Sequence, residues 1–301
     1  MKLQSLIDRA IQFPPITVAV AAAEDEDVLE AIQEALRRTL SRFLLYGDRE
    51  KIIELINAKF PELMNNGDLQ IIHALTNQEA AEKAVKAVHL NEASVLMKGN
   101  VQTAVILKAI LNKEYGLRTG NILSHVAVFE IPDFDRLLFI TDAAMNLYPD
   151  LQQKVQIIEN AVAIARSVGV NWPSVAPIAA VEVVNPSMQA TLDAAALSQM
   201  NRRGQITNCL IDGPLAFDNA ISSLSAEQKG IKSEVAGRAD ILLVPTIEVG
   251  NALYKSLTYF AKAKVVGVIA GAKAPIVLTS RADSAESKLY SLALAICSIK
   301  H

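Results

Sequence analysis

The sequence predicts an α/β protein with mostly parallel sheets, and two observations lead to this fold class. Short runs of β-branched and aliphatic residues alternate with segments of helical period along the chain, which is typical of parallel strands joined by helices. The chain has 301 residues, 51% of them hydrophobic and 20% charged. This composition fits a folded protein with one large domain or two ordinary ones.

Four strand–helix units come first along the chain. Their predicted strands read ITVAVAA (16–22), RFLLYG (42–47), LQIIHAL (69–75) and SVLMKG (94–99). Their predicted helices span residues 25–40, 49–60, 77–90 and 100–111. A strand that is followed each time by a helix predicts a parallel sheet covered by helices.

The alternation changes after residue 123, where SHVAVFEIP (124–132) and RLLFITDAA (136–144) follow each other as in a hairpin. Further strands are predicted in VAPIAAVE, CLIDGPLAF, ADILLVPTIE, VVGVIAGA and IVLTS, and further helices at 150–168, at 187–199, from Gly250 and at the C-terminus. We therefore predict two lobes, residues 1–145 and 146–283, with the last helix (284–301) able to complete the first lobe.

Composition excludes several classes of function. The net charge of −3, with Lys and Arg scattered among acidic residues, gives no basic surface for nucleic acid or for an anionic membrane. The N-terminus lacks the apolar core of a signal peptide and no apolar run reaches transmembrane length, so we expect a cytoplasmic protein. Cys209 and Cys297 are expected to be buried reduced thiols, and no Cys/His spacing predicts a metal site.

Common cofactor and nucleophile motifs are missing from the sequence. No GxGxxG follows the first strand, and neither a Walker A motif nor a GxSxG elbow is present. A Rossmann cofactor site, a P-loop and an α/β-hydrolase are therefore disfavoured. What remains is a set of polar residues at strand ends, where open α/β sheets bind ligands.

The first candidate stretch is LMKGNVQT, residues 96–103. A strand that ends at Met97, a turn at Lys98 and Gly99 and a helix from Asn100 would direct backbone N–H groups and a lysine toward an anion. Lys98, Gly99 and Thr103 are its candidate binding residues. Taken alone, an ordinary turn with a solvated lysine is the better interpretation.

The second candidate stretch is CLIDGPLAFDNA, residues 209–220. Asp212 ends a predicted strand, and Asp-Gly-Pro forces a defined turn. Asp212 and Pro214 are candidate binding residues, although the sequence is equally compatible with a turn that has no further role.

The third candidate stretch is PTIEVGNALYK, residues 245–255. Glu248 is predicted to close a strand, Gly250 and Asn251 permit a close approach of the backbone, and Lys255 follows one helical turn later. The Gly-Asn pair also fits a helix cap, but the number of polar groups beside it exceeds what a cap needs. Glu248, Gly250, Asn251 and Lys255 are the candidate binding residues.

The fourth candidate stretch is VLTSRADSAESK, residues 277–288. Asp283 and Glu286 fit a capping box, with Asp283 as the N-cap. Ser280 and Arg281 then precede the positive end of a helix, a position suited to phosphate. We place the catalytic hypothesis on this Ser-Arg pair.

Together, IDGPLAFDNA, PTIEVGNALYK and VLTSRADSAESK resemble segments of the phosphate acetyl/butyryl transferase family, and the last is most similar to its phosphate butyryltransferase branch. LMKG, SHVAVFEIP and ITDAAMN occur in the expected order, so the resemblance spans nearly the whole chain. It implies a two-lobed fold like that of isocitrate and isopropylmalate dehydrogenases, with a cleft between the lobes. It also implies a homodimer or a higher homo-oligomer.

The resemblance implies exchange of coenzyme A and phosphate on a short-chain acyl group, in fatty acid metabolism: butanoyl-CoA + phosphate = butanoyl phosphate + CoA. Acyl-CoA and phosphate are then the substrates, and no metal or nicotinamide cofactor is expected. An acetyl-preferring enzyme is the alternative within the family. A nicotinamide-linked dehydrogenase and a noncatalytic CoA sensor on the same fold are more distant alternatives.

The resemblance also implies roles for individual residues. Arg281 would hold phosphate and the thioester carbonyl oxygen together, while Ser280 would donate a hydrogen bond to the thioester or its sulfur. Acetyl-specific relatives carry an aspartate where this chain has Ser287. Asp283 and Glu286 are the nearby candidate bases, both with predicted capping roles, and the alternative is that Arg281 and the helix dipole stabilise the thiolate directly. Lys98 and Lys108 stand near first-lobe regions where the acetyl branch carries arginines, so point charges would replace bidentate contacts; a solvated surface role fits Lys108 equally well.

Overall fold

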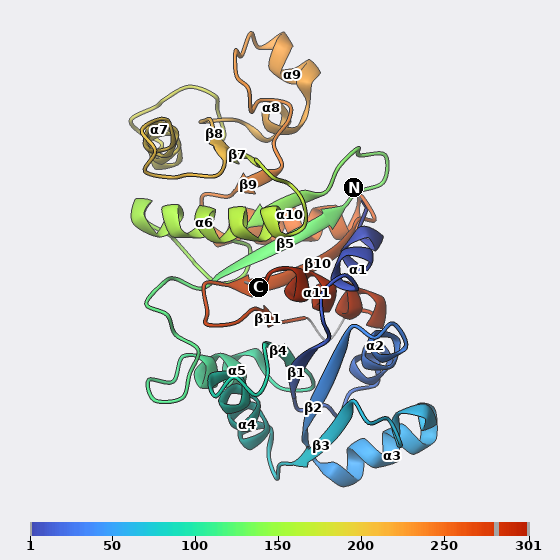
Figure 1. Ribbon diagram of the computed structural model, residues 1–301. Helices are drawn as coiled ribbons and strands as arrows, with labels where there is room; N and C mark the ends of the chain where they lie inside the picture. The colour runs from blue at the N-terminus through green and yellow to red at the C-terminus, as the bar shows by residue number, and fades with distance from the viewer. Residues whose placement is uncertain (1, 280–282, 300–301) are drawn as a thin grey trace. The chain divides into compact units, whose positions relative to one another are not determined.

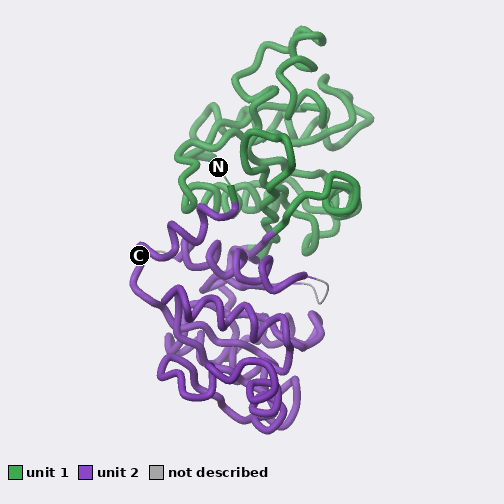
Figure 2. Tube along the Cα trace, turned by 90° about the vertical axis from the view of Figure 1, so that its right-hand side faces the viewer, with its two compact units in different colours: residues 1–2, 122–265 green, residues 3–121, 266–301 purple. Residues whose placement is uncertain are grey.

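The structure, a computed structural model, describes residues 2–279 and 283–299 and divides into two compact units (Figure 2). Unit 1 contains residues 122–265 and the start of the chain, and unit 2 contains residues 3–121 and 266–301. The sequence predicts a change of lobe near residue 145 instead. The strand pair of residues 124–141 belongs with unit 1 because its second strand pairs in parallel with residues 241–243 of that unit.

Unit 2 is built on six strands in the order β3-β2-β1-β4-β11-β10 (Figure 1). They are β1 (Ile16–Ala21), β2 (Ser41–Gly47), β3 (Leu69–His73), β4 (Val95–Lys98), β10 (Lys264–Ala270) and β11 (Ile276–Val277). Neighbouring strands run parallel except for β10 and β11, which are antiparallel. The carboxyl ends of β1, β2, β3, β4 and β11 consequently lie along one edge of this sheet.

The helices of unit 2 are α1 (Gln4–Ala10), α2 (Glu26–Arg37), α3 (Arg49–Lys59), α4 (Asn77–His89), α5 (Thr103–Ile110) and α11 (Ala285–Cys297), with a short 3₁₀ helix η1 (Pro61–Leu63). Asp25, Asp48 and Thr76 cap α2, α3 and α4 by accepting backbone N–H groups of the first turn. From Leu289 to Cys297 every residue of α11 is buried, and α11 packs against α1 and α2. The last helix therefore belongs to the core of the unit that the N-terminal half forms.

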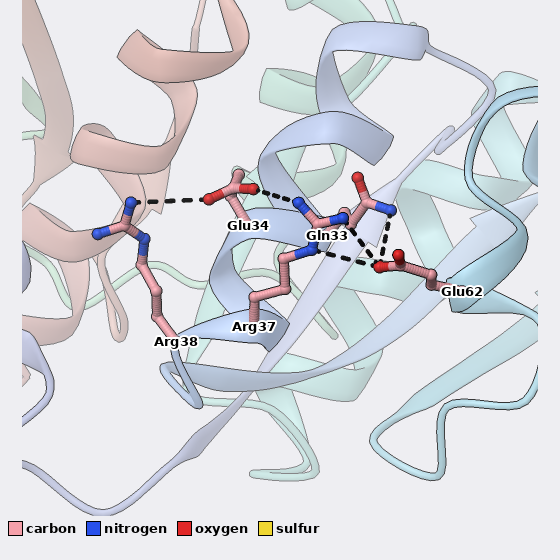
Figure 3. Close-up of polar contacts among 5 residues, drawn as sticks. All are labelled: Gln33, Glu34, Arg37, Arg38 and Glu62. Atoms are coloured by element: carbon pink, nitrogen blue, oxygen red, sulfur yellow. Dashed lines mark hydrogen bonds and ion pairs between the residues drawn. The ribbon is translucent and has the colours of Figure 1, made fainter.

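A surface network joins α2 to η1 in unit 2 (Figure 3). The Arg37 guanidinium donates hydrogen bonds to Glu62 on η1 and to Glu34 on its own helix, at 2.8–3.2 Å. Gln33 also donates to Glu62, and Arg38 forms a longer ion pair with Glu34 at 3.6 Å. Because these side chains are largely exposed, the network is screened by solvent and contributes little to stability.

Unit 1 is built on five strands in the order β5-β6-β9-β7-β8. They are β5 (Ser124–Glu130), β6 (Leu138–Thr141), β7 (Ser174–Pro177), β8 (Leu210–Ile211) and β9 (Ile241–Leu243). β5 and β6 form the predicted antiparallel pair, and the other pairs are parallel. The predicted α/β class with mostly parallel strands is confirmed.

The helices of unit 1 are α6 (Leu151–Ser167), α7 (Gln189–Arg202), α8 (Phe217–Ile221), α9 (Ser223–Gln228) and α10 (Ile247–Tyr259). Asp150 and Gln153 form a complete capping box at the start of α6. One face of the sheet packs around Phe129, Ile140 and Leu242. The short helices α8 and α9 are absent from the sequence-based prediction.

Three predicted helix starts are wrong, each for a local reason. α5 begins at Thr103 rather than Asn100, because the Asn100 N–H is hydrogen-bonded to the Ala22 carbonyl at the end of β1, 2.6 Å away. α10 begins three residues before Gly250, immediately after the extended residue Thr246. Ser284 rather than Asp283 caps α11, since the Ser284 hydroxyl accepts the Ser287 N–H, and the predicted capping box with Glu286 is not formed.

Both cysteines, Cys209 and Cys297, are buried free thiols as predicted. Burial raises the pKa of each thiol to about 11, so both stay protonated near neutral pH. Within residues 2–279 and 283–299, no helix combines the length and the apolar character needed to cross a membrane.

Candidate active site

Lys98 lies at the carboxyl edge of the unit 2 sheet, and its side chain is buried. The residue is 4% exposed, and its ammonium group donates to the backbone carbonyls of Gly99 at 3.2 Å and Thr279 at 3.4 Å. This contact follows from the parallel pairing of β4 with β11, in which Met97 is opposite Val277. The interpretation of Lys98 as a solvated turn residue is therefore wrong. The lysine instead contacts the residue that directly precedes Ser280.

Gly99 allows the ends of β1 and β4 to approach each other closely. A Cβ at this position would lie 2.1 Å from the Ala22 carbonyl oxygen, and the Gly99 N–H donates to the Ala21 carbonyl at 2.8 Å. Packing alone accounts for this glycine. Thr103, the third candidate of this stretch, is exposed at the first residue of α5.

Gly99→Ala is expected to lower the free energy of unfolding by about 1–3 kcal/mol, because backbone atoms must move to admit the methyl group. Urea unfolding followed by circular dichroism measures this loss. Gly67→Ala is the matched control, since a Cβ at Gly67 would meet no atom within 4 Å. Equal stability of the two variants would show that the Gly99 backbone can move away from β1 at little cost.

Thr279 adds a buried hydroxyl group at the same edge. The residue is 7% exposed, and its Oγ1 atom has no hydrogen-bond partner among the residues that the structure describes. The sequence predicts a functional role for the neighbouring Ser280 and a strand position for Thr279. Its special position arises only when β11 is placed beside β4.

Ser280 and Arg281, the predicted catalytic pair, lie outside the described residues. On their C-terminal side, the Asp283 carbonyl accepts a hydrogen bond from the ammonium group of Lys288. Lys288 is 2% exposed, and its Nζ atom also lies 3.8 Å from the Asp27 carboxylate on α2. Lysine ammonium groups thus bind the carbonyls of Thr279 and Asp283, the described residues that flank positions 280–282 in the sequence. The sequence did not single out Lys288.

In unit 1, three candidate residues lie on one face of α10. Glu248, Asn251 and Lys255 are exposed and spaced three and four residues apart, so they share a face of the helix. Glu248 lies in the first turn of α10, which corrects its predicted place at a strand end. Hydrogen bonds from its own backbone N–H and from the Tyr148 hydroxyl (2.8 Å) hold the pKa of the Glu248 carboxyl below its ordinary value. This face therefore carries a carboxylate, an amide and a lysine side chain.

Gly250 brings α10 against the segment that follows β6. A Cβ at Gly250 would lie 2.8 Å from the Asp142 carbonyl oxygen and 2.9 Å from the Ala143 Cα. The close backbone approach predicted from the sequence is confirmed. The Asp142 carboxylate is occupied locally, since it accepts the N–H groups of Ala144 and Met145 and the Asn146 amide at 2.6–3.0 Å.

Asp212 directly follows β8, as predicted, and borders a cavity of about 560 Å³. Its carboxylate lies 3.8 Å from the Arg202 guanidinium, and Lys232 and Ser233 also line this cavity. Pro214 is buried, so it shapes the turn rather than presenting a surface to ligand.

The predicted residues thus form separate groups. Lys98 and Gly99 in unit 2 lie near Thr279, the residue that precedes Ser280 in the sequence, whereas the α10 residues and Asp212 belong to unit 1. Within the described part of the chain, no three His, Cys, Asp or Glu side chains are grouped closely enough to hold a metal ion.

Comparison with known proteins relates the chain to acyl transferases. A family model described as phosphate acetyl/butaryl transferase matches residues 67–296. A "Probable phosphate butyryltransferase" of Bacillus subtilis is 59% identical, over 99% of this chain and 98% of that protein. A "Phosphate acetyltransferase" of Thermotoga maritima is 49% identical, over 92% of this chain and 93% of the relative.

Among solved structures, a branched-chain phosphotransacylase from Enterococcus faecalis matches with a TM-score of 0.83 and 35% identity, over 95% of this chain and 99% of that one. The likeness therefore extends over both compact units. The chain belongs to the phosphate acetyl/butaryl transferase family.

Proposed function

We propose that this protein transfers a short-chain acyl group between coenzyme A and phosphate, with butanoyl-CoA + phosphate = butanoyl phosphate + CoA as its reaction. The observation that carries the proposal is the buried ammonium group of Lys98, which contacts the residue next to Ser280 and Arg281. A buried cation beside a Ser-Arg pair suits two anionic or polarised reactants, phosphate and a thioester carbonyl.

The proposed chemistry requires orientation and charge stabilisation. A phosphate oxygen attacks the thioester carbon, the carbonyl oxygen becomes an oxyanion, and the carbon–sulfur bond then breaks to release the CoA thiolate. In our proposal Arg281 binds phosphate and the oxyanion, Ser280 donates a hydrogen bond to the thioester, and Lys98 adds positive potential. Asp283 is proposed as the candidate base for the thiol in the reverse direction.

The α10 face and Asp212 are proposed as binding residues for coenzyme A. Lys255 would bind the phosphate groups of coenzyme A, while Asn251 and Glu248 would bind polar atoms of coenzyme A through an amide and a carboxylate. CoA and phosphate act as substrates in this proposal, and no metal or nicotinamide takes part. We also propose that the protein works in the cytoplasm as a homodimer or higher homo-oligomer, which sedimentation analysis of the purified protein would test.

The test of the reaction is thiol release from butanoyl-CoA and acetyl-CoA, each measured with and without inorganic phosphate. We expect phosphate-dependent release that favours butanoyl-CoA. Phosphate-dependent release that favours acetyl-CoA would keep the reaction and change the acyl group. Release without phosphate dependence, or binding of CoA without turnover, would reject the proposed function.

A further inference from the structure

The Thr279 hydroxyl is a hydrogen-bonding group without a partner among residues 2–279 and 283–299. Only 7% of the Thr279 surface is exposed, and its Oγ1 atom has no hydrogen-bond partner on any described residue. Burying a hydroxyl without a partner disfavours the folded state, because the group loses its bonds to water. Other buried threonines avoid this cost: Thr141 Oγ1 donates to the His125 carbonyl at 2.9 Å, and Thr191 Oγ1 contacts the Asn185 and Met188 carbonyls.

The position of Thr279 connects this unused group with the candidate active site. Thr279 follows β11 at the carboxyl edge of the unit 2 sheet, where open α/β sheets bind ligands. Its own carbonyl accepts a hydrogen bond from the buried Lys98 ammonium group at 3.4 Å. A donor hydroxyl and a buried cation therefore come from neighbouring strand ends, and together they match the chemistry of an oxyanion.

We propose that the Thr279 hydroxyl donates a hydrogen bond to an oxygen of the substrate during acyl transfer. The acceptor is an anionic oxygen, either of the phosphate nucleophile or of the thioester carbonyl as it becomes negative. The inference rests on the proposed function and deepens it by adding a substrate contact outside the Ser-Arg pair. The hydroxyl then acquires its partner only when substrate is bound. It therefore lowers the stability of the ligand-free protein and raises the activity of the enzyme.

Thr279→Val tests the proposal, because valine keeps the shape of threonine and removes the hydroxyl. We expect the thermal midpoint of the ligand-free protein to stay equal or rise, while kcat/KM for phosphate-dependent thiol release falls at least about tenfold. Thr279→Ser, which keeps the hydroxyl, is expected to stay within about threefold of wild type in kcat/KM. If Thr279→Val does not fold, Thr279→Ala replaces it in the same comparison.

The two possible acceptors predict different kinetics. If the hydroxyl binds ground-state phosphate, Thr279→Val raises KM for phosphate. If the bond forms only as the carbonyl oxygen becomes negative, Thr279→Val lowers kcat. Either pattern supports the contact and identifies its acceptor.

Ser41→Ala is the matched control for removing an unused hydroxyl. Ser41 is 3% exposed, its Oγ atom also lacks a partner among described residues, and it begins β2 at the opposite, amino edge of the same sheet. We expect this variant to keep wild-type kcat and KM. The proposal is overturned if Thr279→Val keeps kcat/KM within twofold of an active wild type. An inactive wild type would instead reject the proposed function itself.

Discussion

Replacing Arg281 with alanine is expected to lower kcat for phosphate-dependent thiol release about 10²–10³-fold, the loss that follows removal of one oxyanion donor in other enzymes. The guanidinium is the strongest donor of the predicted catalytic pair, and charge develops on the carbonyl oxygen only during the reaction. The loss should therefore appear in kcat more than in KM. Steady-state kinetics with butanoyl-CoA and saturating phosphate measure it.

Two further variants separate the role of the guanidinium from a general effect of charge. Arg281→Lys keeps the charge but not the planar pair of donors, so we expect an activity between those of alanine and wild type. Arg38→Ala is the matched control, because Arg38 forms an exposed ion pair with Glu34 at 3.6 Å (Figure 3). We expect wild-type kinetics from it. Retention of more than half of the wild-type kcat by Arg281→Ala would remove this arginine from the catalytic mechanism.

The local sequence predicted most of the fold because its signals are short-range. The first four strands and the helices α2, α3 and α4 match their predicted spans within a few residues, since each combines a β-branched run, a capping residue and an amphipathic helix. The strands β8 and β11 have two residues each. The sequence predicts a strand in each of these stretches, but pairing with neighbouring strands sets their short extent. The helices α8 and α9 are not predicted, because five and six residues are too few for a helical period.

The site was predicted less completely, because burial and contact depend on elements distant in sequence. Lys98 and Thr279 are separated by 181 positions, and the pairing of β4 with β11 brings them together. Lys98 is interpreted from the sequence as a solvated turn residue and Lys288 is not singled out, yet both are buried. The close backbone approach predicted at Gly250 is found, although the glycine lies inside α10 rather than at the predicted helix start.

Lys154→Met is expected to lower the free energy of unfolding of unit 1 by about 3–5 kcal/mol, because it leaves a buried carboxylate without its cation. The Lys154 ammonium group on α6 lies 2.5 Å from the Asp193 carboxylate on α7, and the two residues are 5% and 7% exposed. Gln189 donates to the other carboxylate oxygen at 2.8 Å, so both oxygens are engaged. Urea unfolding with a probe in unit 1, such as the fluorescence of Trp172, measures the change.

The double variant Lys154→Met/Asp193→Leu separates the net contribution of the ion pair to the free energy of unfolding from the destabilisation caused by removing one partner. Desolvation offsets much of the attraction in a buried pair, so two apolar side chains of similar size are expected to recover at least half of the stability that the single variant loses. Arg37→Met is the control for an exposed network (Figure 3), and its unfolding midpoint should stay close to wild type. A double variant as unstable as Lys154→Met would show instead that the pair holds α6 against α7 by an attraction that apolar packing cannot replace.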